Sequence, residues 1–301
     1  MGTPEFAVPS LEILVNNKKN VVTVVTAEDK PQGRGKKAGM SAIKVTALKY
    51  GIKILQPSSL KSLEFIDELK SLKADLQVVV AFRMLPEIAW SMPPKGTFNL
   101  HASLLPHYRG AAPINWAIIN GEKETGVTTF FLKHEIDTGE IIFQEKEPIQ
   151  ESDDAGTLYE RLMMKGANLV LKTVEAIERA EAEPKKQEAN LTLRHAPKIF
   201  NETCKVDWRK SADQLNNFIK GLSPYPGAWT EINSKTFKVY KAVRSNDNSY
   251  AADGTFKINH QNDLLVKCSD SWLCIADFQP EGKKRMSPQE FLRGNKLDLQ
   301  K

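Results

Sequence analysis

Hydrophobic and polar positions alternate along the first half of the chain in a way that predicts strands and helices in turn. Short apolar runs rich in β-branched residues, which are typical of buried strands, lie at residues 21–25, 52–55, 76–81 and 97–101. Stretches with helical spacing lie before and between them, at residues 10–17, 41–50 and 60–72. Strands separated by helices of this length predict βαβ units and a mostly parallel sheet.

The pattern continues to residue 178 and then changes. Two β-rich runs at 126–132 and 140–145 predict a further pair of strands, and apolar residues at helical spacing predict a long helix over 156–178. Residues 180–190, AEAEPKKQEAN, are polar, charged and interrupted by a proline, which predicts a linker.

Beyond residue 197, one predicted helix at 211–221 is followed by short β-rich runs at 229–232, 237–242, 255–258, 264–268 and 272–278. Five short strands at this spacing predict a small antiparallel barrel of the OB type. We therefore predict an α/β protein that has a Rossmann-like domain with a mostly parallel sheet at 1–179, a linker at 180–197 and an OB-like β-barrel domain at 198–301.

The length of 301 residues also favours two domains over one. The formal net charge is +5, and its distribution is uneven: residues 198–301 contain 17 Lys and Arg against 12 Asp and Glu, whereas residues 1–197 contain 25 of each sign. All of the excess positive charge therefore lies in the last third, which indicates a basic module attached to a neutral one.

Composition argues against several classes of protein. No apolar run reaches the roughly 18 residues that span a bilayer, and the first residues lack the basic and apolar regions of a signal peptide. Cys204, Cys268 and Cys274 show neither CxxC nor Cys/His spacing, which argues against a disulfide framework and a zinc site. We expect a cytoplasmic protein that needs no metal.

The strongest candidate for chemistry is the segment 98–110, FNLHASLLPHYRG. Side chains alternate along a strand, so Asn99 and His101 point to the same face near the strand's C-terminal end, the edge at which open α/β sheets bind ligands. An amide donor beside an imidazole suits the stabilisation of an oxyanion and a proton transfer. The alternative is that His101 is a structural histidine held by hydrogen bonds.

Asp137, in the segment IDTG at 136–139, is a third candidate because its carboxylate could orient an imidazole. Asp-Thr-Gly after an apolar run is also typical of a plain turn. Periodicity alone does not show whether Asp137 and His101 meet.

Several motifs together resemble those of the folate-dependent formyltransferases: GTPEFA at 2–7, N-x-H at 99–101 followed by SLLP-x-YRGAAP at 103–113, and IDTG at 136–139. Two further features are similar to the members of that family that act on methionyl-tRNA: DKP-x-GRGKK at 29–37, and a C-terminal module with GLSPYPGAW at 221–229 and GKKRM at 282–286. The motifs occur in collinear order over most of the chain.

The resemblance implies transfer of a formyl group from the co-substrate 10-formyltetrahydrofolate to the α-amino group of methionine on initiator tRNA, for translation initiation. It implies that Asn99 donates a hydrogen bond to the oxygen that becomes negative, that His101 supplies a second donor and moves the proton, and that Asp137 orients the imidazole. It also implies a monomer, a formyltransferase domain at 1–179 and a tRNA-binding domain at 198–301.

For the folate pocket, the resemblance implies contacts from Phe82, Ser103, Leu104, Leu105 and Pro106. Ordinary packing is the alternative for the two leucines. The chain departs from the commoner family pattern in lacking a Tyr-Gly pair near Phe82, where its loop is one residue shorter, and in carrying KHE at 133–135, where many relatives have Asp-x-Gly. These departures bear on the details of the pocket and leave the reaction class unchanged.

Residues 30–37, KPQGRGKK, carry four positive charges and no negative one, and their glycines and proline predict a mobile, exposed loop that is neither helix nor strand. A solvated charged loop is one interpretation. The resemblance favours contacts with the tRNA acceptor stem from Lys30, Arg34, Lys36 and Lys37, with Arg34 the best suited because of its planar guanidinium. The basic C-terminal module, equally, could track an RNA backbone or present a solvated face.

In the family, a buried apolar strand precedes the Gly-Thr-Pro turn, whereas Met1 stands directly at that turn. A sheet without that strand would leave unpaired strand edges. We therefore expect roughly five to eight apolar residues, the length of one strand, to be encoded upstream of Met1.

Two rival functions remain open. A folate-dependent formyltransferase acting on a small amine, such as an amino-sugar nucleotide or a purine intermediate, would keep Asn99, His101 and Asp137 but should lack the basic loop and the C-terminal module. A nucleotide- or RNA-binding protein without catalysis would use the sheet only as a scaffold. A Rossmann oxidoreductase is disfavoured because Gly-Thr-Pro at 2–4 is not a GxGxxG fingerprint.

Overall fold

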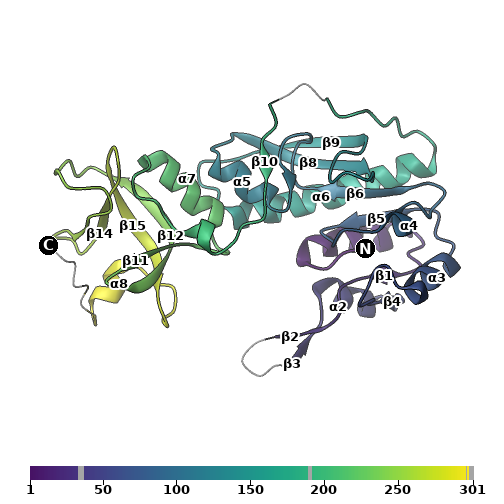
Figure 1. The fold of residues 1–301 in the computed structure, drawn as a ribbon, viewed down its shortest axis with the longest axis horizontal. Helices are drawn as coiled ribbons and strands as arrows, with labels where there is room; N and C mark the ends of the chain where they lie inside the picture. The colour runs from purple at the N-terminus through teal and green to yellow at the C-terminus, as the bar shows by residue number, and fades with distance from the viewer. Residues whose placement is uncertain (33–36, 189–191, 296, 298–301) are drawn as a thin grey trace. The chain divides into compact units, whose positions relative to one another are not determined.

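The computed structural model describes residues 1–32, 37–188, 192–295 and 297, and it confirms the predicted α/β architecture (Figure 1). The chain divides into two compact units, and each is assembled from several segments. The first comprises Met1–Gly110, Glu124–Pro148 and Tyr159–His195; the second comprises Ala111–Lys123, Ile149–Leu158 and Ala196–Lys301.

The first unit is built on β-strands that pair in two groups. A four-stranded sheet has the order β5 (Gln77–Val80), β6 (Thr97–His101), β8 (Glu124–Phe131) and β9 (Ile141–Pro148), in which β5 and β6 are parallel and the other pairs antiparallel. The short strands β1 (Val24–Val25) and β4 (Ile54–Leu55) form a parallel pair. Met1 and Gly2 connect the two groups, because Gly2 N donates to Val25 O at 3.0 Å and Val80 N donates to Met1 O at 2.9 Å.

The helical elements of the first unit follow the predicted spacing. They are η1 (Glu5–Ala7), α1 (Val8–Asn16), α2 (Ala42–Lys49), α3 (Leu63–Ser71) and α4 (Glu87–Trp90), together with most of α6 (Ala155–Glu178). Serine caps set two of the starts: Ser41 Oγ accepts from Lys44 N, and Ser62 Oγ accepts from Phe65 N. Helix α3 therefore begins at Leu63, three residues after the start that periodicity predicted.

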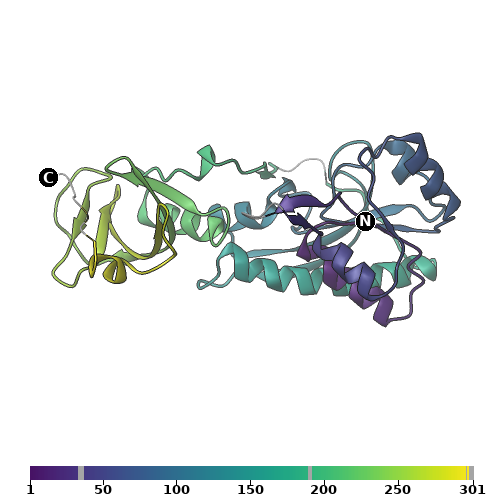
Figure 2. The same ribbon diagram turned by 90° about the horizontal axis from the view of Figure 1, so that it is seen from below.

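Helix α6 covers one face of the four-stranded sheet (Figure 2). Gly166 allows the helix to approach closely, since a Cβ added there would lie 2.7 Å from Leu100 Cδ2 on β6. Phe98 and Leu100 are buried on the sheet, as the alternation along β6 predicts.

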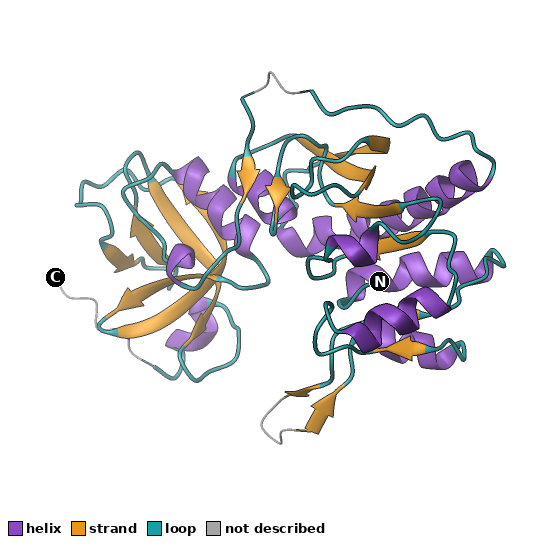
Figure 3. Cartoon of the chain, turned by 45° about the vertical axis from the view of Figure 1, so that its right-hand side comes forward, coloured by secondary structure: helices purple, strands orange, loops and turns teal. Residues whose placement is uncertain are grey.

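The prediction that residues 30–37 contain no strand is wrong for the part of the segment that the structure describes. β2 (Lys30–Gln32) and β3 (Lys37–Gly39) form an antiparallel ribbon, drawn in orange in Figure 3. A two-stranded ribbon tolerates proline because each strand has an unpaired edge, so Pro31 does not prevent pairing. Two further short strands, β7 (Arg109–Gly110) and β10 (His195–Ala196), complete the inventory up to residue 196.

The second unit contains a curled antiparallel sheet that forms a half-barrel, which is consistent with the predicted OB-like domain. Its strand order is β11 (Ala228–Ile232), β12 (Lys235–Ser245), β15 (Trp272–Pro280), β14 (Leu264–Lys267) and β13 (Phe256–Ile258). A register shift in β12 around Lys241 marks a bulge, a feature that bends strands. The helical elements of this unit are α5 (Pro113–Ile119), η2 (Glu202–Cys204), α7 (Ala212–Leu222) and α8 (Pro288–Leu292).

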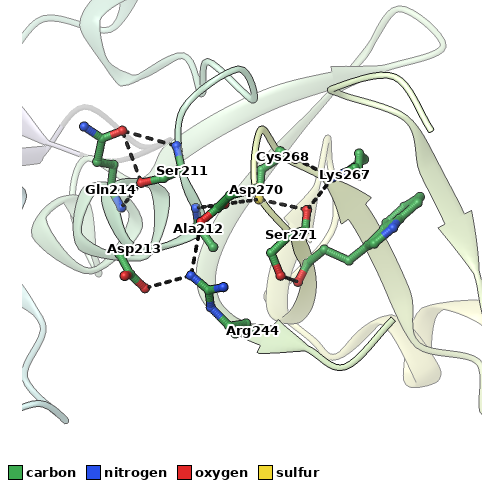
Figure 4. Close-up of polar contacts among 10 residues, drawn as sticks. Ser211, Ala212, Asp213, Gln214, Arg244, Lys267, Cys268, Asp270 and Ser271 are labelled. Carbon is green, nitrogen blue, oxygen red and sulfur yellow. Dashed lines mark hydrogen bonds and ion pairs between the residues drawn. The ribbon is translucent and has the colours of Figure 1, made fainter. Parts of the chain in front are cut away.

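Helix α7 is anchored to both the sheet and α5. Ser211 and Gln214 form a capping box, Asp270 Oδ1 accepts from Ala212 N at 2.8 Å, and Arg244 bridges Asp213 and Asp270 (Figure 4). On the side of α5, a Cβ at Gly221 would lie 2.5 Å from Ile119 Cγ1. The hydrophobic core of the unit joins Leu215 of α7 to strand residues such as Val239 of β12 and Leu273 of β15.

No helix among residues 1–32, 37–188, 192–295 and 297 combines the length and apolar character needed to cross a membrane.

Candidate active site

Strand β6 positions Asn99 and His101 on the face of the sheet opposite α6. Leu100 points toward Gly166 of α6, so its two neighbours in the strand point the other way. The register holds them on both sides, because Asn99 pairs with Val79 of β5 and Phe130 of β8, and His101 pairs with Thr128 of β8. Asn99 is half-buried and, within the described residues, its side-chain amide makes no hydrogen bond, so its donors are available to a ligand.

The His101 imidazole is buried, and each of its two nitrogens faces an oxygen atom. Nε2 lies 2.8 Å from the carbonyl oxygen of Tyr108, and Nδ1 lies 3.9 Å from Asp137 Oδ2. Because a carbonyl oxygen only accepts, this contact assigns a hydrogen to Nε2 and leaves Nδ1 facing the carboxylate. The structure thus brings together the two residues whose contact periodicity left open.

Asp137 is fixed by the backbone around it. It lies between β8 and β9 in the left-handed region, at φ 56°, and its Oδ2 accepts from Gly110 N at 2.9 Å. Tyr108, whose carbonyl meets His101, is also left-handed at φ 61°. Non-glycine residues in this region are uncommon and gather at functional sites, which is consistent with a preorganised cluster.

Gln187 is a residue of this cluster that the sequence analysis did not identify. Its Nε2 donates to the carbonyls of Asp137 and Gly139, each at 2.8 Å, and its Oε1 accepts from the guanidinium of Arg109. It lies in the stretch predicted as a linker, where Lys185 also pairs with Ile141 of β9 through two backbone bonds of 2.8 Å. The polar composition of AEAEPKKQEAN predicted a linker here, and nothing in that sequence distinguishes Gln187 from its neighbours.

The loop after β6 carries the residues predicted to contact folate, and it is internally well bonded. Ser103 is fully buried and donates from Oγ to His107 O at 2.7 Å, while its own carbonyl accepts from Thr128 Oγ1 at 2.6 Å. Leu105 N donates to Thr128 Oγ1 and Leu105 O accepts from Gln144 Nε2. These partners fix the shape of the loop.

Leu104 and Leu105 pack as ordinary core residues would. A Cβ at Gly126 of β8 would lie 2.6 Å from Leu104 Cδ2, and Leu105 is buried, as is Pro106. Phe82 is half-buried and packs against the core formed by α3, α4 and β5, with the Arg83 guanidinium over its ring. A direct folate contact from Phe82 or from the loop after β6 stays a prediction.

Exposed apolar side chains gather on segments next to this cluster. Met84, Ile88 and Ile136 are 72%, 56% and 61% exposed, and the two segments that carry them meet where His134 Nε2 lies 3.1 Å from Glu87 Oε1. Exposed apolar groups beside a polar site suit a ligand with aromatic rings, such as a folate. Of the residues in this neighbourhood, Phe82 was identified from the sequence as a folate contact, whereas Ile88 and Ile136 were not.

The residues predicted to contact tRNA are only partly described. Lys30 begins β2 and Lys37 begins β3 of the ribbon, whereas Arg34 and Lys36 lie outside the described residues. Their role in RNA binding therefore stays a prediction.

Neither a metal-binding group nor a disulfide is present among the described residues. Among the described residues, no group of three or more His, Cys, Asp or Glu side chains could hold a metal ion. The three cysteines are free thiols, and burial raises the pKa of each.

Comparison with known proteins extends this picture to the whole chain. The family model described as formyl transferase matches residues 1–174, and that described as formyl transferase, C-terminal domain, matches residues 198–296. A methionyl-tRNA formyltransferase of Bacteroides fragilis is 49% identical, with the match covering 98% of this chain and 93% of the relative. One from Azobacteroides pseudotrichonymphae is 51% identical and covers 98% and 94% of the two chains.

Solved structures share the fold at lower identity. An N-formyltransferase from Helicobacter canadensis, in complex with folinic acid and dTDP-3-aminofucose, has a TM-score of 0.69 at 24% identity over 93% of this chain and 97% of that chain. HypX from Aquifex aeolicus, in complex with tetrahydrofolic acid, has a TM-score of 0.61 at 20% identity over 83% of this chain and 45% of that chain. With both family models matched and about half of the residues shared along nearly the whole chain, this protein belongs to the methionyl-tRNA formyltransferase family.

Proposed function

We propose that the chain transfers the formyl group of 10-formyltetrahydrofolate to the α-amino group of methionine carried by initiator tRNA. The observation that carries this proposal is the similarity to methionyl-tRNA formyltransferases at 49% identity over 98% of the chain. The cluster of Asn99, His101 and Asp137 also supports the proposal, because formyl transfer needs a hydrogen-bond donor to the oxyanion and a group that carries the proton.

Asn99 acts on the oxygen of the formyl group. As the amine attacks the formyl carbon, that oxygen gains negative charge, and the side-chain NH₂ of Asn99 donates a hydrogen bond to it. A donor of this kind contributes about 2.7–4 kcal/mol to the stabilisation of a transition state. The strand pairing on both sides of Asn99 holds the donor in position before the substrate arrives.

His101 moves the proton. Its Nε2 hydrogen is directed at the Tyr108 carbonyl, so Nδ1 is the nitrogen that accepts the proton lost by the amine and returns one to the folate nitrogen that leaves. At 3.9 Å, Asp137 is too far from Nδ1 for a direct hydrogen bond, but its charge stabilises the positive ring that forms in between.

The chain is divided into two domains joined by a linker at 180–197. We assign formyl transfer to the domain at 1–179 and tRNA binding to the domain at 198–301. Lys30, Arg34, Lys36 and Lys37 of the first domain also contact the tRNA. The protein acts as a monomer in the cytoplasm, where its tRNA and folate substrates occur. The excess of positive charge beyond residue 197 supports contact with an RNA backbone.

A formyl-transfer assay tests the substrate directly. Methionyl initiator tRNA, methionyl elongator tRNA and an amino-sugar nucleotide are offered in parallel with 10-formyltetrahydrofolate. We expect rapid formylation of the initiator tRNA alone. Formylation of the amino sugar with neither tRNA modified would replace the proposal with the small-amine alternative, which the relatives at about half identity do not favour.

A further inference from the structure

The second unit contains a cavity of about 380 Å³ that the proposed chemistry does not use. The side chains that give it chemical character are Asn115, Lys198, Phe200, Asn201, Tyr225 and Lys238. All of them belong to the second unit, so the cavity is complete within it. Its volume lies near the lower end of the range of about 300–1,000 Å³ typical of pockets for small ligands, which suits one nucleotide-sized group.

Two aromatic side chains at the cavity are displayed to solvent. Tyr225 is 81% exposed and Phe200 is 55% exposed, although most large apolar residues of this unit are buried in its core. Rigid aromatic rings left in solvent are the side chains that proteins use as anchors for flat ligands. Two such rings at one cavity therefore indicate a binding surface.

The backbone under both rings is held firmly. Tyr225 stands between two prolines in a loop closed by a hydrogen bond from Gly227 N to Leu222 O of 2.8 Å, and Lys238 Nζ donates to Pro226 O at 2.7 Å. Phe200 O accepts from Thr203 Oγ1 at 2.7 Å. The rings are thus presented on a prearranged surface, which lowers the entropic cost of binding.

The charge at the cavity is positive and not neutralised. Lys198 and Lys238 line it, and none of its described lining residues is acidic. Within the described chain, neither lysine forms an ion pair with a carboxylate, whereas Lys205 and Lys257 of the same unit pair with Glu231 and Asp247. Lys198 Nζ lies 5.3 Å from the centre of the Phe200 ring, so charge and aromatic face are adjacent.

We infer that this cavity binds an unpaired nucleotide of the tRNA substrate, with the base stacked on Tyr225 or Phe200 and the phosphate beside Lys198 and Lys238. The inference rests on the proposed function, because it takes tRNA to be the substrate. Aromatic faces next to lysines are the combination that binds single-stranded nucleic acid with little sequence preference. Asn115, which is half-buried, and Asn201, which is exposed, also line the cavity and add amide groups for a base edge or ribose.

Binding measurements on purified full-length variants test the inference. At least one of Tyr225→Ala and Phe200→Ala, the one whose ring holds the base, should raise the Kd for tRNA about 5- to 150-fold, the loss of one base stack. Tyr225→Phe keeps the ring and should bind like the wild type. Lys198→Gln should lower the slope of log Kd against log salt concentration by about one, because one phosphate contact is lost. The KM for 10-formyltetrahydrofolate should not change in any of them.

Two variants of the same unit serve as matched controls. Tyr250 is 99% exposed and Lys235 is exposed, and neither lines the cavity. Tyr250→Ala and Lys235→Gln should leave the Kd and its salt dependence unchanged. Because Tyr225 is itself largely exposed, its truncation should not lower the melting temperature, so a change in Kd reports binding and not folding.

Other outcomes would overturn the inference in distinguishable ways. If Tyr225→Ala and Phe200→Ala bind tRNA as the controls do while the wild type formylates methionyl-tRNA, the cavity does not hold tRNA and the proposed function stands. A second outcome is that AMP or CMP binds the wild type, and Tyr225→Ala weakens this binding without changing the Kd for tRNA. The cavity would then be a site for free nucleotides. A folded wild type that does not formylate methionyl-tRNA would remove the proposed function itself.

Discussion

At the scale of single residues, the site depends on where the two nitrogens of His101 point. Nε2 meets the Tyr108 carbonyl at 2.8 Å and Nδ1 meets Asp137 at 3.9 Å. The types Asn, His and Asp could be identified from the sequence because their chemistry and the N-x-H spacing suggested them. Tyr108 and Gln187 could not, since Tyr108 acts through its backbone carbonyl and Gln187 contacts the site from a stretch 50 residues beyond Asp137.

Replacement of Asp137 by Asn separates its charge from its shape. The amide oxygen can still accept the hydrogen bond from Gly110 N, so the loop should stay in place. Loss of the negative charge removes the group that stabilises the imidazolium, and kcat should fall about 10²- to 10⁴-fold. Steady-state kinetics measure this, with KM for both substrates expected to change little.

The outcome that would argue against this role is a large rise in KM with kcat intact. Asp137 would then bind substrate and would not support the proton transfer of His101. Melting temperature serves as the control for folding, and it should be close to that of the wild type.

At the scale of secondary structure elements, strand β6 is the best predicted part of the fold. Its bounds, Thr97–His101, are those that the apolar run predicted. A strand in the middle of a sheet is buried, so the apolar residues on either side of Asn99 mark it clearly in the sequence. The ribbon β2–β3 was missed because a charged segment with glycine and proline offers no apolar pattern, whereas the two strands pair through their backbones, which the sequence pattern does not reveal.

The turn after Asp137 depends on a close approach that only glycine permits. A Cβ at Gly139 would lie 1.5 Å from the carbonyl oxygen of Phe131, which is backbone and cannot move aside cheaply. Gly139→Ala should therefore displace the turn that carries Asp137, lower the free energy of unfolding by about 1–3 kcal/mol and reduce kcat. Thermal denaturation and the formyl-transfer assay measure the two effects.

Gly294→Ala is the matched control for this change, because nothing lies within 4 Å of a Cβ built there. It should alter neither stability nor kcat. A Gly139→Ala variant as stable and active as Gly294→Ala would show that the turn does not need the close approach.

At the scale of the whole molecule, the chain order does not follow the compact units. Residues 111–123 and 149–158 belong to the second unit although they precede the linker, and α5 packs against α7 there. Linear signals such as a polar stretch or a change in strand spacing cannot reveal this, because the contacts join segments about 100 residues apart. Asn115 and Gly221, joined by a hydrogen bond of 2.7 Å, are an example.

The two substrates should be separable by mutation. Arg34 lies in the basic segment at 30–37, and its guanidinium suits phosphate contacts. Arg34→Ala should raise the KM for methionyl-tRNA about tenfold or more, a typical loss for a charge-assisted contact, and leave the KM for 10-formyltetrahydrofolate unaltered. Equal effects on both values would remove the segment from the RNA-binding surface.

We propose that Asn99 and His101 carry out formyl transfer to methionyl-tRNA. The most direct measurement is single-turnover formylation of methionyl initiator tRNA by the wild type, His101→Ala, Asn99→Ala and His260→Ala, the last being an exposed histidine of the second unit. We predict a rate lower by about 10²- to 10⁴-fold for His101→Ala and by about 10²- to 10³-fold for Asn99→Ala, with His260→Ala unchanged. A folded His101→Ala enzyme that transfers formyl at the rate of His260→Ala would contradict the account.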